Sequence, residues 1–264
     1  MTTLHLLRLP FDGRALTALG VAQGHAGDRF AVDSGYLVHA GLKAVLGEAA
    51  PKPFRIEHED LDPLPVLAYG ARPLAELRRA AEAGEHARLV RWEEAAEREM
   101  PLPFAPGRRL GFTATACPTV RIARGVGAFD PGSEQDAYVA WLRRQGFPDP
   151  AERDPEERAR VYLDWLAARL GPAARIETAR LAAMRAARLW RKGRPSRPRA
   201  MGYGRDGVDR AKGRGGVLDR RSVTFAGVLA VEDGEAFTAL LARGVGRHRA
   251  FGFGMLLLRP AGAA

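Results

Sequence analysis

Residues 244–258 read GVGRHRAFGFGMLLL and join an expected helix to the last expected strand of the chain. The four glycines allow the backbone to approach a ligand closely, and the three basic side chains supply positive charge. The apolar residues at the end would anchor the loop in a core. These are features of a phosphate-holding loop beside a strand, although glycines in such places are also typical of turns and bulges. The residues that would contact a phosphate are Gly244, Gly246, Arg247, His248, Arg249, Gly252 and Gly254.

The composition favours a globular protein with an anionic partner. The chain has 264 residues, 46% of them hydrophobic and 27% charged, which is enough to bury a core in one large or two small domains. Lysine and arginine number 41 against 31 acidic residues, so the formal net charge is +10. A nucleic acid suits this charge. A basic but merely solvated surface would give the same total, so the clustering of the charges has to decide.

The single cysteine, Cys117, excludes an internal disulfide and gives no basis for a cysteine zinc site. We therefore expect no metal and no cofactor. Residues 1–10 lack the basic start and the cleavage site of a secretion signal, and no apolar run approaches the length of a membrane span. The expected location is the cytoplasm, without membrane contact.

The N-terminal part of the chain follows the order strand, helix, strand, strand, helix, strand, which is typical of a ferredoxin-like arrangement. The stretch MPLPFAPG at residues 100–107 contains three prolines, which resist both helix and sheet, and we expect a linker there. It would separate domains at 1–99 and 108–264. The expected elements of the first domain are strands at 3–9, 53–59, 65–69 and 89–92 and helices at 33–47 and 73–83.

Three polar side chains stand on one face of the helix expected at 33–47. Tyr36, His39 and Lys43 are spaced i, i+3 and i+7, which stacks a phenol, an imidazole and an ammonium. Such a trio could carry out acid–base chemistry without a metal, because imidazole exchanges protons near neutral pH while the other two groups orient or stabilise a phosphate. An ordinary amphipathic helix with a packed tyrosine and a histidine at its rim is the alternative.

The second part of the chain repeats the same order of elements around a basic segment. Residues 185–221 carry thirteen Arg or Lys against three Asp, with many glycines and two prolines. Such a segment cannot pack its own core, so we expect a loop or the tip of a long hairpin that orders on a phosphate backbone; an idle linker is the alternative. The expected elements are strands at 109–116, 222–231 and 251–258, helices at 133–145, 155–170 and 234–242, and a segment at 174–190 that fits helix and strand equally.

Taken together, these pieces resemble the CasE family, the CRISPR RNA-processing endoribonucleases of type I-E systems. The resemblance spans nearly the whole chain, and the ending is its most specific part. It is carried by the helix with Tyr36 and His39, by PGRRLGFTATACPT at 106–119, AWL at 140–142 and SVTFAGVL at 222–229, and by RGVGRHRAFGFGML at 243–256.

The resemblance implies an α+β protein of two tandem ferredoxin-like domains, related to the RNA-recognition fold, each with an antiparallel sheet and two helices. It further implies binding of a CRISPR repeat RNA stem-loop, one cut without metal, and a lasting place beside other subunits of the Cascade surveillance complex. Tyr36 and His39 correspond to the catalytic pair of the family. The residues that a basic hairpin would place in the groove of the RNA stem are Arg185, Arg188, Arg191, Lys192, Arg194, Arg197 and Arg199.

The chemistry that fits is attack of a ribose 2′-hydroxyl on the adjacent phosphate, which leaves a 2′,3′-cyclic phosphate and a 5′-hydroxyl. His39 would act as general acid or base, Tyr36 as its partner, and Lys43 as a phosphate stabiliser. A non-catalytic RNA-binding subunit is the chief rival. A nucleotide-binding enzyme fits poorly, because its glycine fingerprint would follow a strand and open a helix, whereas these glycines precede a strand.

Overall fold

The computed structural model describes most of the chain, with gaps at both ends and at five internal segments. One of these gaps covers residues 192–215 of the basic segment, so Lys192, Arg194, Arg197 and Arg199 lie outside the described residues. The described residues are 3–23, 34–58, 62–122, 132–146, 154–191 and 216–262.

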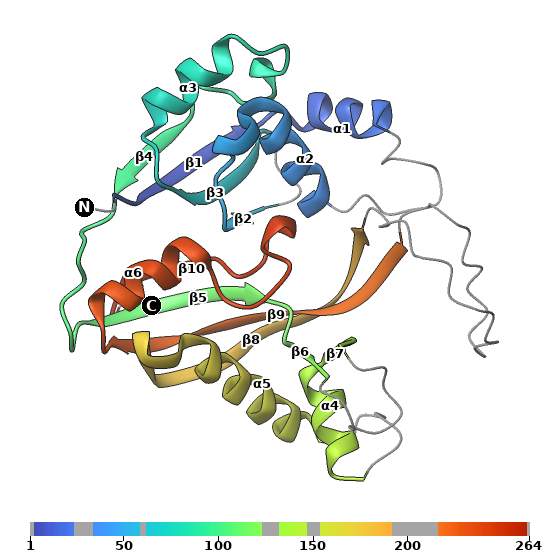
Figure 1. Ribbon diagram of the computed structural model, residues 1–264, viewed down its shortest axis with the longest axis vertical. Helices are drawn as coiled ribbons and strands as arrows, with labels where there is room; N and C mark the ends of the chain where they lie inside the picture. Colours follow the sequence, from blue (N-terminus) through green and yellow to red (C-terminus); the bar gives the residue numbers. More distant parts are fainter. Residues whose placement is uncertain are drawn as a thin grey trace.

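The N-terminal half is built on an antiparallel sheet with the strand order β2-β3-β1-β4. Its helices lie on the side of the sheet that is turned away from the rest of the molecule (Figure 1). The elements are β1 (His5–Phe11), α1 (Gly13–Ala22), α2 (Ser34–Leu46), η1 (Gly47–Ala49), β2 (Phe54–Ile56), β3 (Leu64–Gly70), α3 (Leu74–Glu82), η2 (Ala87–Leu89) and β4 (Ala96–Glu99).

Side chains along β1 and the residue before it point alternately to the two faces of the sheet, which pack on the helices and on the C-terminal half. Leu7, Leu9 and Phe11 are fully buried against the helices. Leu4 and Leu6 belong instead to the cluster that continues into the C-terminal half. Because successive side chains of a strand point to opposite faces, a single short segment contributes to both cores.

The C-terminal half contains a second antiparallel sheet, with the strand order β10-β5-β9-β8. Helix α5 packs on it through Trp165, whose ring stacks on Phe225 at 6.3 Å. A small two-stranded sheet, β6 and β7, is inserted after β5. The elements are β5 (Arg109–Ala116), β6 (Thr119–Arg121), β7 (Glu134–Asp136), α4 (Ala137–Arg144), α5 (Pro155–Leu170), η3 (Gly171–Ala173), β8 (Ala174–Arg191), β9 (Gly216–Val231), α6 (Gly234–Arg243), η4 (Arg249–Phe251) and β10 (Leu256–Pro260).

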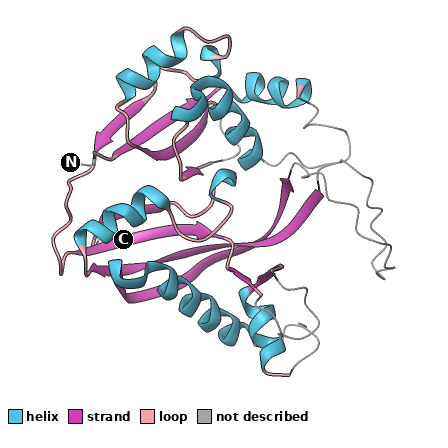
Figure 2. Ribbon diagram, viewed as in Figure 1, coloured by secondary structure: helices cyan, strands magenta, loops and turns pink. Residues whose placement is uncertain are grey.

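Both sheets have the order that the ferredoxin-like arrangement requires, since β4-β1-β3-β2 and β10-β5-β9-β8 place the equivalent strands side by side. The expected fold class is confirmed. Among the described residues, each half carries one helix beyond the two of a ferredoxin-like unit: α1, which was not expected from the sequence, and α4, which corresponds to the helix expected at 133–145 (Figure 2). All strands of the first sheet precede residue 100 and all strands of the second follow residue 108, and we propose residues 100–107 as the domain boundary.

The two halves are in direct contact through the face of the first sheet that carries no helices. The Tyr69 hydroxyl on β3 donates a hydrogen bond to the Leu256 carbonyl on β10 at 2.9 Å. Arg55 on β2 donates to the Thr113 hydroxyl on β5 at 3.1 Å. Burial raises the pKa of Tyr69, so this phenol remains a donor. The proposed boundary segment is not free either, because Phe104 is buried and packs edge-on against Phe237 at 5.2 Å.

Three expected elements differ in the structure. The short strand expected at 89–92 is wrong, because this stretch turns through η2 and keeps one bridge, Phe11 to Val90, while the fourth strand is β4. The final strand begins at Leu256 rather than 251, because η4 and two positive-φ glycines interrupt the extended backbone. The helix expected from 133 starts after Asp136. The Asp136 carboxylate accepts hydrogen bonds from the backbone N–H groups of Tyr138 and Val139 and so caps α4.

The segment that fitted both helix and strand is the strand β8. It pairs with β9 along its length, and the register shifts between Ile176 and Thr178 and again between Leu181 and Ala183. Each shift inverts the alternation of side chains, so neither period survives in the sequence. Within the described residues, the helices are too short or too polar to cross a lipid bilayer.

Candidate functional site

Helix α2 brings the two residues of the expected catalytic pair to the junction of the two halves. Its apolar positions, including Val38 and Leu42, are buried in the N-terminal core, which fixes the rotation of the helix. Tyr36 and His39 are both half-buried on another face. The Tyr36 ring stacks on Phe251 of η4, with ring centroids 6.1 Å apart and an interplanar angle of 26°. The helix of one half therefore touches the glycine loop of the other.

The environment of His39 favours the neutral imidazole. Burial lowers its pKa, and the positive charges of Lys52 and Lys43 lower it further. At neutral pH such a ring is ready to accept a proton. Lys52 was missed in the sequence, because it precedes β2 and only the fold brings its charge close to His39.

We expect an NMR titration of the free protein to place the pKa of His39 below its usual 6.5. The substitution Lys52→Gln should raise this pKa, because it removes one of the two positive charges that oppose protonation. It should recover only part of the shift, since burial is the larger cause. His39→Asn would assign the resonance, and Arg175→Gln, which removes an exposed charge on β8, is the matched control. An unchanged pKa in Lys52→Gln would show that Lys52 does not act on His39.

Lys43 makes structural contacts at the C-terminal end of α2. Its Nζ donates to the Gly47 carbonyl at 3.2 Å and to the Glu48 carboxylate at 2.6 Å. A cation at the C-terminus of a helix is favourable there, because it satisfies a terminal carbonyl and opposes the helix dipole. Its expected role on a phosphate stays a prediction, while Lys52 lies at the cavity described next.

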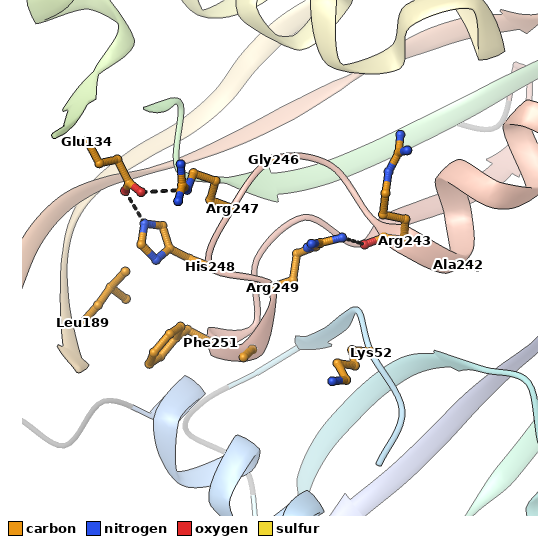
Figure 3. Close-up of a pocket in the computed structure, with 11 residues that line it drawn as sticks. Lys52, Glu134, Leu189, Ala242, Arg243, Gly246, Arg247, His248, Arg249 and Phe251 are labelled. Carbon is orange, nitrogen blue, oxygen red and sulfur yellow. Dashed lines mark hydrogen bonds and ion pairs between the residues drawn. The ribbon is translucent and has the colours of Figure 1, made fainter. Parts of the chain in front are cut away.

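A cavity of about 820 Å³ lies between the halves. Lys52 lines it from the N-terminal half, and Arg243, Arg247, His248 and Arg249 line it from the other (Figure 3). With so many cationic groups around one space, an anionic ligand is favoured electrostatically. Phe251 belongs to the same wall and stacks on Tyr36, so one side chain of the wall links the cavity to α2, while Tyr36 and His39 are not among the residues that line it.

The glycine loop owes its shape to positive φ angles. Gly244, Gly246, Gly252 and Gly254 have φ between 75° and 83°, a region that other residues rarely adopt. A Cβ atom on Gly254 would lie 2.2 Å from the Val245 carbonyl oxygen.

The glycines also lie against the protein itself. A Cβ on Gly246 would lie 2.8 Å from Cη2 of Trp165, and one on Gly244 would lie 3.0 Å from the Pro53 ring of the N-terminal half. Packing and backbone conformation therefore account for these glycines. Their contact with a phosphate stays a prediction.

Glu134 on β7 organises the basic wall of the cavity. Its Oε1 contacts Nε of Arg220 at 3.2 Å and Nε2 of His248 at 2.5 Å, and its Oε2 contacts Nε of Arg247 at 2.8 Å. Burial by itself raises the pKa of Glu134, but the hydrogen bond from His248 and the three positive partners outweigh it and hold the pKa at about 2. Glu134 was not recognised from the sequence, because its partners are 86 and more positions away.

The basic hairpin is described only along its arms. Arg185 is exposed on β8 opposite Ser222, and Arg188 and Arg191 lie further along the same strand, with their side chains outside the described part. Leu189 is buried beside Cys117 and Phe253, so the hairpin base adjoins the glycine loop. In the parts of the chain that the structure describes, no group of His, Cys, Asp and Glu could hold a metal ion.

The fold and the site define a protein of two ferredoxin-like halves with a cationic cavity at their junction. The chain belongs to the CRISPR associated protein family, whose model matches residues 4–260. No curated protein matches it by sequence.

Several solved structures share this fold. The CRISPR endoribonuclease Cse3 bound to a 19-nucleotide RNA has a TM-score of 0.60 at 20% identity, covering 98% of this chain and 100% of that one. Thermus thermophilus Cse3 bound to an RNA that represents a pre-cleavage complex has a TM-score of 0.56 at 20% identity, with the same coverage of 98% and 100%. Cas6e from Escherichia coli K-12 has a TM-score of 0.51 at 19% identity, covering 97% and 99%. At these identities the likeness shows the fold.

Proposed function

We propose that this protein is a metal-independent endoribonuclease that recognises the stem-loop of CRISPR repeat RNA and cuts precursor transcripts into guide RNAs. It would then remain on the 3′ hairpin as a subunit of a Cascade complex. The observation that carries the proposal is that Tyr36, on the same helix as the neutral His39, stacks on Phe251 of η4 beside a cationic cavity. Membership of the CRISPR associated protein family and the likeness to Cse3 bound to RNA support it.

The chemistry needs only what RNA and these side chains supply. A ribose 2′-oxygen attacks the adjacent phosphorus, a bond forms between them, and the bond from phosphorus to the 5′-oxygen breaks. His39, held neutral, takes the proton of the 2′-hydroxyl. The products are a 2′,3′-cyclic phosphate and a 5′-hydroxyl.

Tyr36 and the surrounding cations complete the proposed step. Burial raises the pKa of Tyr36, so its phenol stays protonated and can donate to the phosphate or supply the proton that the leaving 5′-oxygen needs. Lys52 and Arg247 would stabilise the charge that accumulates on the phosphate oxygens. Alignment of the 2′-oxygen, the phosphorus and the leaving oxygen is the remaining contribution of the bound stem-loop.

The direct test is incubation of the purified protein with the repeat RNA encoded beside its own gene, in buffer with EDTA. We expect one cut at a single position, a 5′-hydroxyl on the downstream fragment and a cyclic phosphate on the upstream one. A matched RNA with a deoxyribose at the cleavage position should bind and stay intact, because it lacks the nucleophile. Tight binding of the all-ribose RNA without any cut would instead identify a non-catalytic RNA-binding subunit.

A further inference from the structure

The negatively charged carboxylate of Glu134 lies on a surface that is proposed to bind phosphate, where a negative charge is not expected. It is the acidic member of a cavity wall that carries Arg243, Arg247, His248 and Arg249. A negative charge at this position weakens the attraction for an RNA backbone. A direct contribution to affinity therefore does not explain it, and its contacts point to a different use.

We propose that Glu134 is a positioning residue for RNA cleavage, which sets η4 against the catalytic helix through His248 and turns Arg247 toward the bound phosphate. This inference rests on the proposed function of the same site. It assigns to Glu134 a role in the rate of the cut rather than in the affinity for RNA.

The strand that carries Glu134, β7, is fixed by hydrogen bonds of Asp136. Two residues further on, Asp136 accepts hydrogen bonds from the backbone N–H groups of Tyr138 and Val139, which begins α4. The other oxygen of Asp136 accepts from the Tyr162 hydroxyl of α5 at 2.8 Å. Strand β7 is thus fixed to two helices, so Glu134 presents its carboxylate from a rigid support.

The partners of Glu134 come from separate parts of the chain and are well shielded. The side chains of Glu134, Arg220 and His248 are 15%, 17% and 10% exposed, so water screens their interaction only weakly. Arg247 is 41% exposed and meets the carboxylate through Nε. A contact through Nε does not use the two terminal amino groups of the guanidinium, and these can bind a phosphate.

His248 is the link from the carboxylate to the catalytic helix. It has a φ of 61°, the one positive φ outside glycine in the described residues, and such strain persists only where surrounding contacts impose it. It opens η4, and its carbonyl accepts the Phe251 backbone N–H at 2.8 Å. The rings of His248 and Phe251 are 6.1 Å apart, and Phe251 stacks on Tyr36. A continuous series of contacts therefore runs from Glu134 to Tyr36.

The test is Glu134→Gln in the full-length protein, with single-turnover cleavage and RNA binding measured separately. Glutamine keeps the shape and loses the charge that faces Arg220, Arg247 and His248. We expect the cleavage rate at saturating RNA to fall by about 10-fold, because small misplacements of reacting groups cost rates of this order. The dissociation constant should change less than about 3-fold, or tighten, since a repulsive charge is removed.

The matched control is Glu177→Gln. Glu177 on β8 also pairs with the Nε of an arginine, Arg109, at 2.7 Å, but it is not part of the cavity wall. It should leave both quantities unchanged.

A double-mutant cycle separates positioning from general loss of structure. If Glu134 acts through η4, Phe251→Ala already breaks the link to Tyr36, and adding Glu134→Gln should slow the cut by much less than it does alone. The proposal would be overturned if Glu134→Gln slowed the cut by the same factor in the wild-type and Phe251→Ala proteins. A wild-type cleavage rate in the Glu134→Gln protein would overturn it as well. If Glu134→Gln fails to fold, His248→Asn, which tolerates the left-handed backbone, must show the same loss of rate at unchanged affinity or the proposal fails. Failure of the wild-type protein to cut any repeat RNA would refute the proposed function itself.

Discussion

Replacing His39 with alanine should slow cleavage of repeat RNA by roughly 10²–10⁴-fold, the usual contribution of a general acid or base. RNA affinity should stay within a few-fold, because the half-buried ring is held neutral and carries no charge toward the phosphate backbone. Alanine is the strongest helix former, so α2 and its packing in the N-terminal core should persist. The measurement is a single-turnover time course in EDTA with a binding isotherm for the same RNA.

The comparison needs a histidine variant outside the site. His86→Ala serves, because His86 precedes η2, outside α2, and lines no part of the cavity. It should cut at the wild-type rate. A His39→Ala protein that also cuts at that rate would remove His39 from the mechanism and leave Tyr36 without its proposed partner.

Removing three charges from the basic hairpin should weaken RNA binding on the order of 100-fold at moderate salt. The triple variant carries the substitutions Arg191→Gln, Lys192→Gln and Arg194→Gln. Each phosphate contact that disappears lowers the slope of log affinity against log salt by roughly 0.7–0.9, so three contacts flatten it by about 2–3. The rate of the cut at saturating RNA should be nearly unchanged, because the proposed proton transfers use Tyr36 and His39 and not these residues.

A second triple variant controls for the loss of net charge. Arg72, Arg78 and Arg79 lie at or on α3, where the first two pair with nearby glutamates on the outer surface. Changing them to Gln removes the same charge from a face without the cavity, and affinity should fall only slightly. An unaltered salt slope in the hairpin variant would show that the hairpin does not contact the phosphates.

The sequence predicted the bounds of an element correctly where capping residues or regular alternation mark them. Helix α5 has the predicted bounds, because Asp154 caps it, Pro155 begins it and Gly171 follows its last residue. Strand β5 also has the predicted bounds, because its buried side chains alternate. The segment at 174–190, which fitted helix and strand equally, could not be resolved in this way. Two register shifts in β8 destroy the alternation, and pairing with β9 rather than intrinsic preference decides its structure.

The candidate site shows the same division. Spacing on one helix placed Tyr36 and His39 on a common face, since a helix fixes the geometry of neighbours three and four positions apart. Lys52, Glu134 and Phe251 lie on separate elements of two halves, and only long-range packing brings them to the same place. The glycines of the loop were expected to let the backbone approach a ligand, with turns or bulges as the alternative. The structure shows positive φ angles and close packing there, and the sequence could not distinguish a bend forced by packing from one shaped for a ligand.

The contact between the halves has a consequence for any attempt to divide the protein. Leu4, Leu67 and Tyr69 are covered by the C-terminal half, and Tyr69 uses a carbonyl of β10 as its acceptor. A fragment that ended before residue 100 would present these groups to water as an adhesive apolar patch. Such a fragment should self-associate when expressed alone, and co-expression of the remainder should rescue it as a one-to-one split protein.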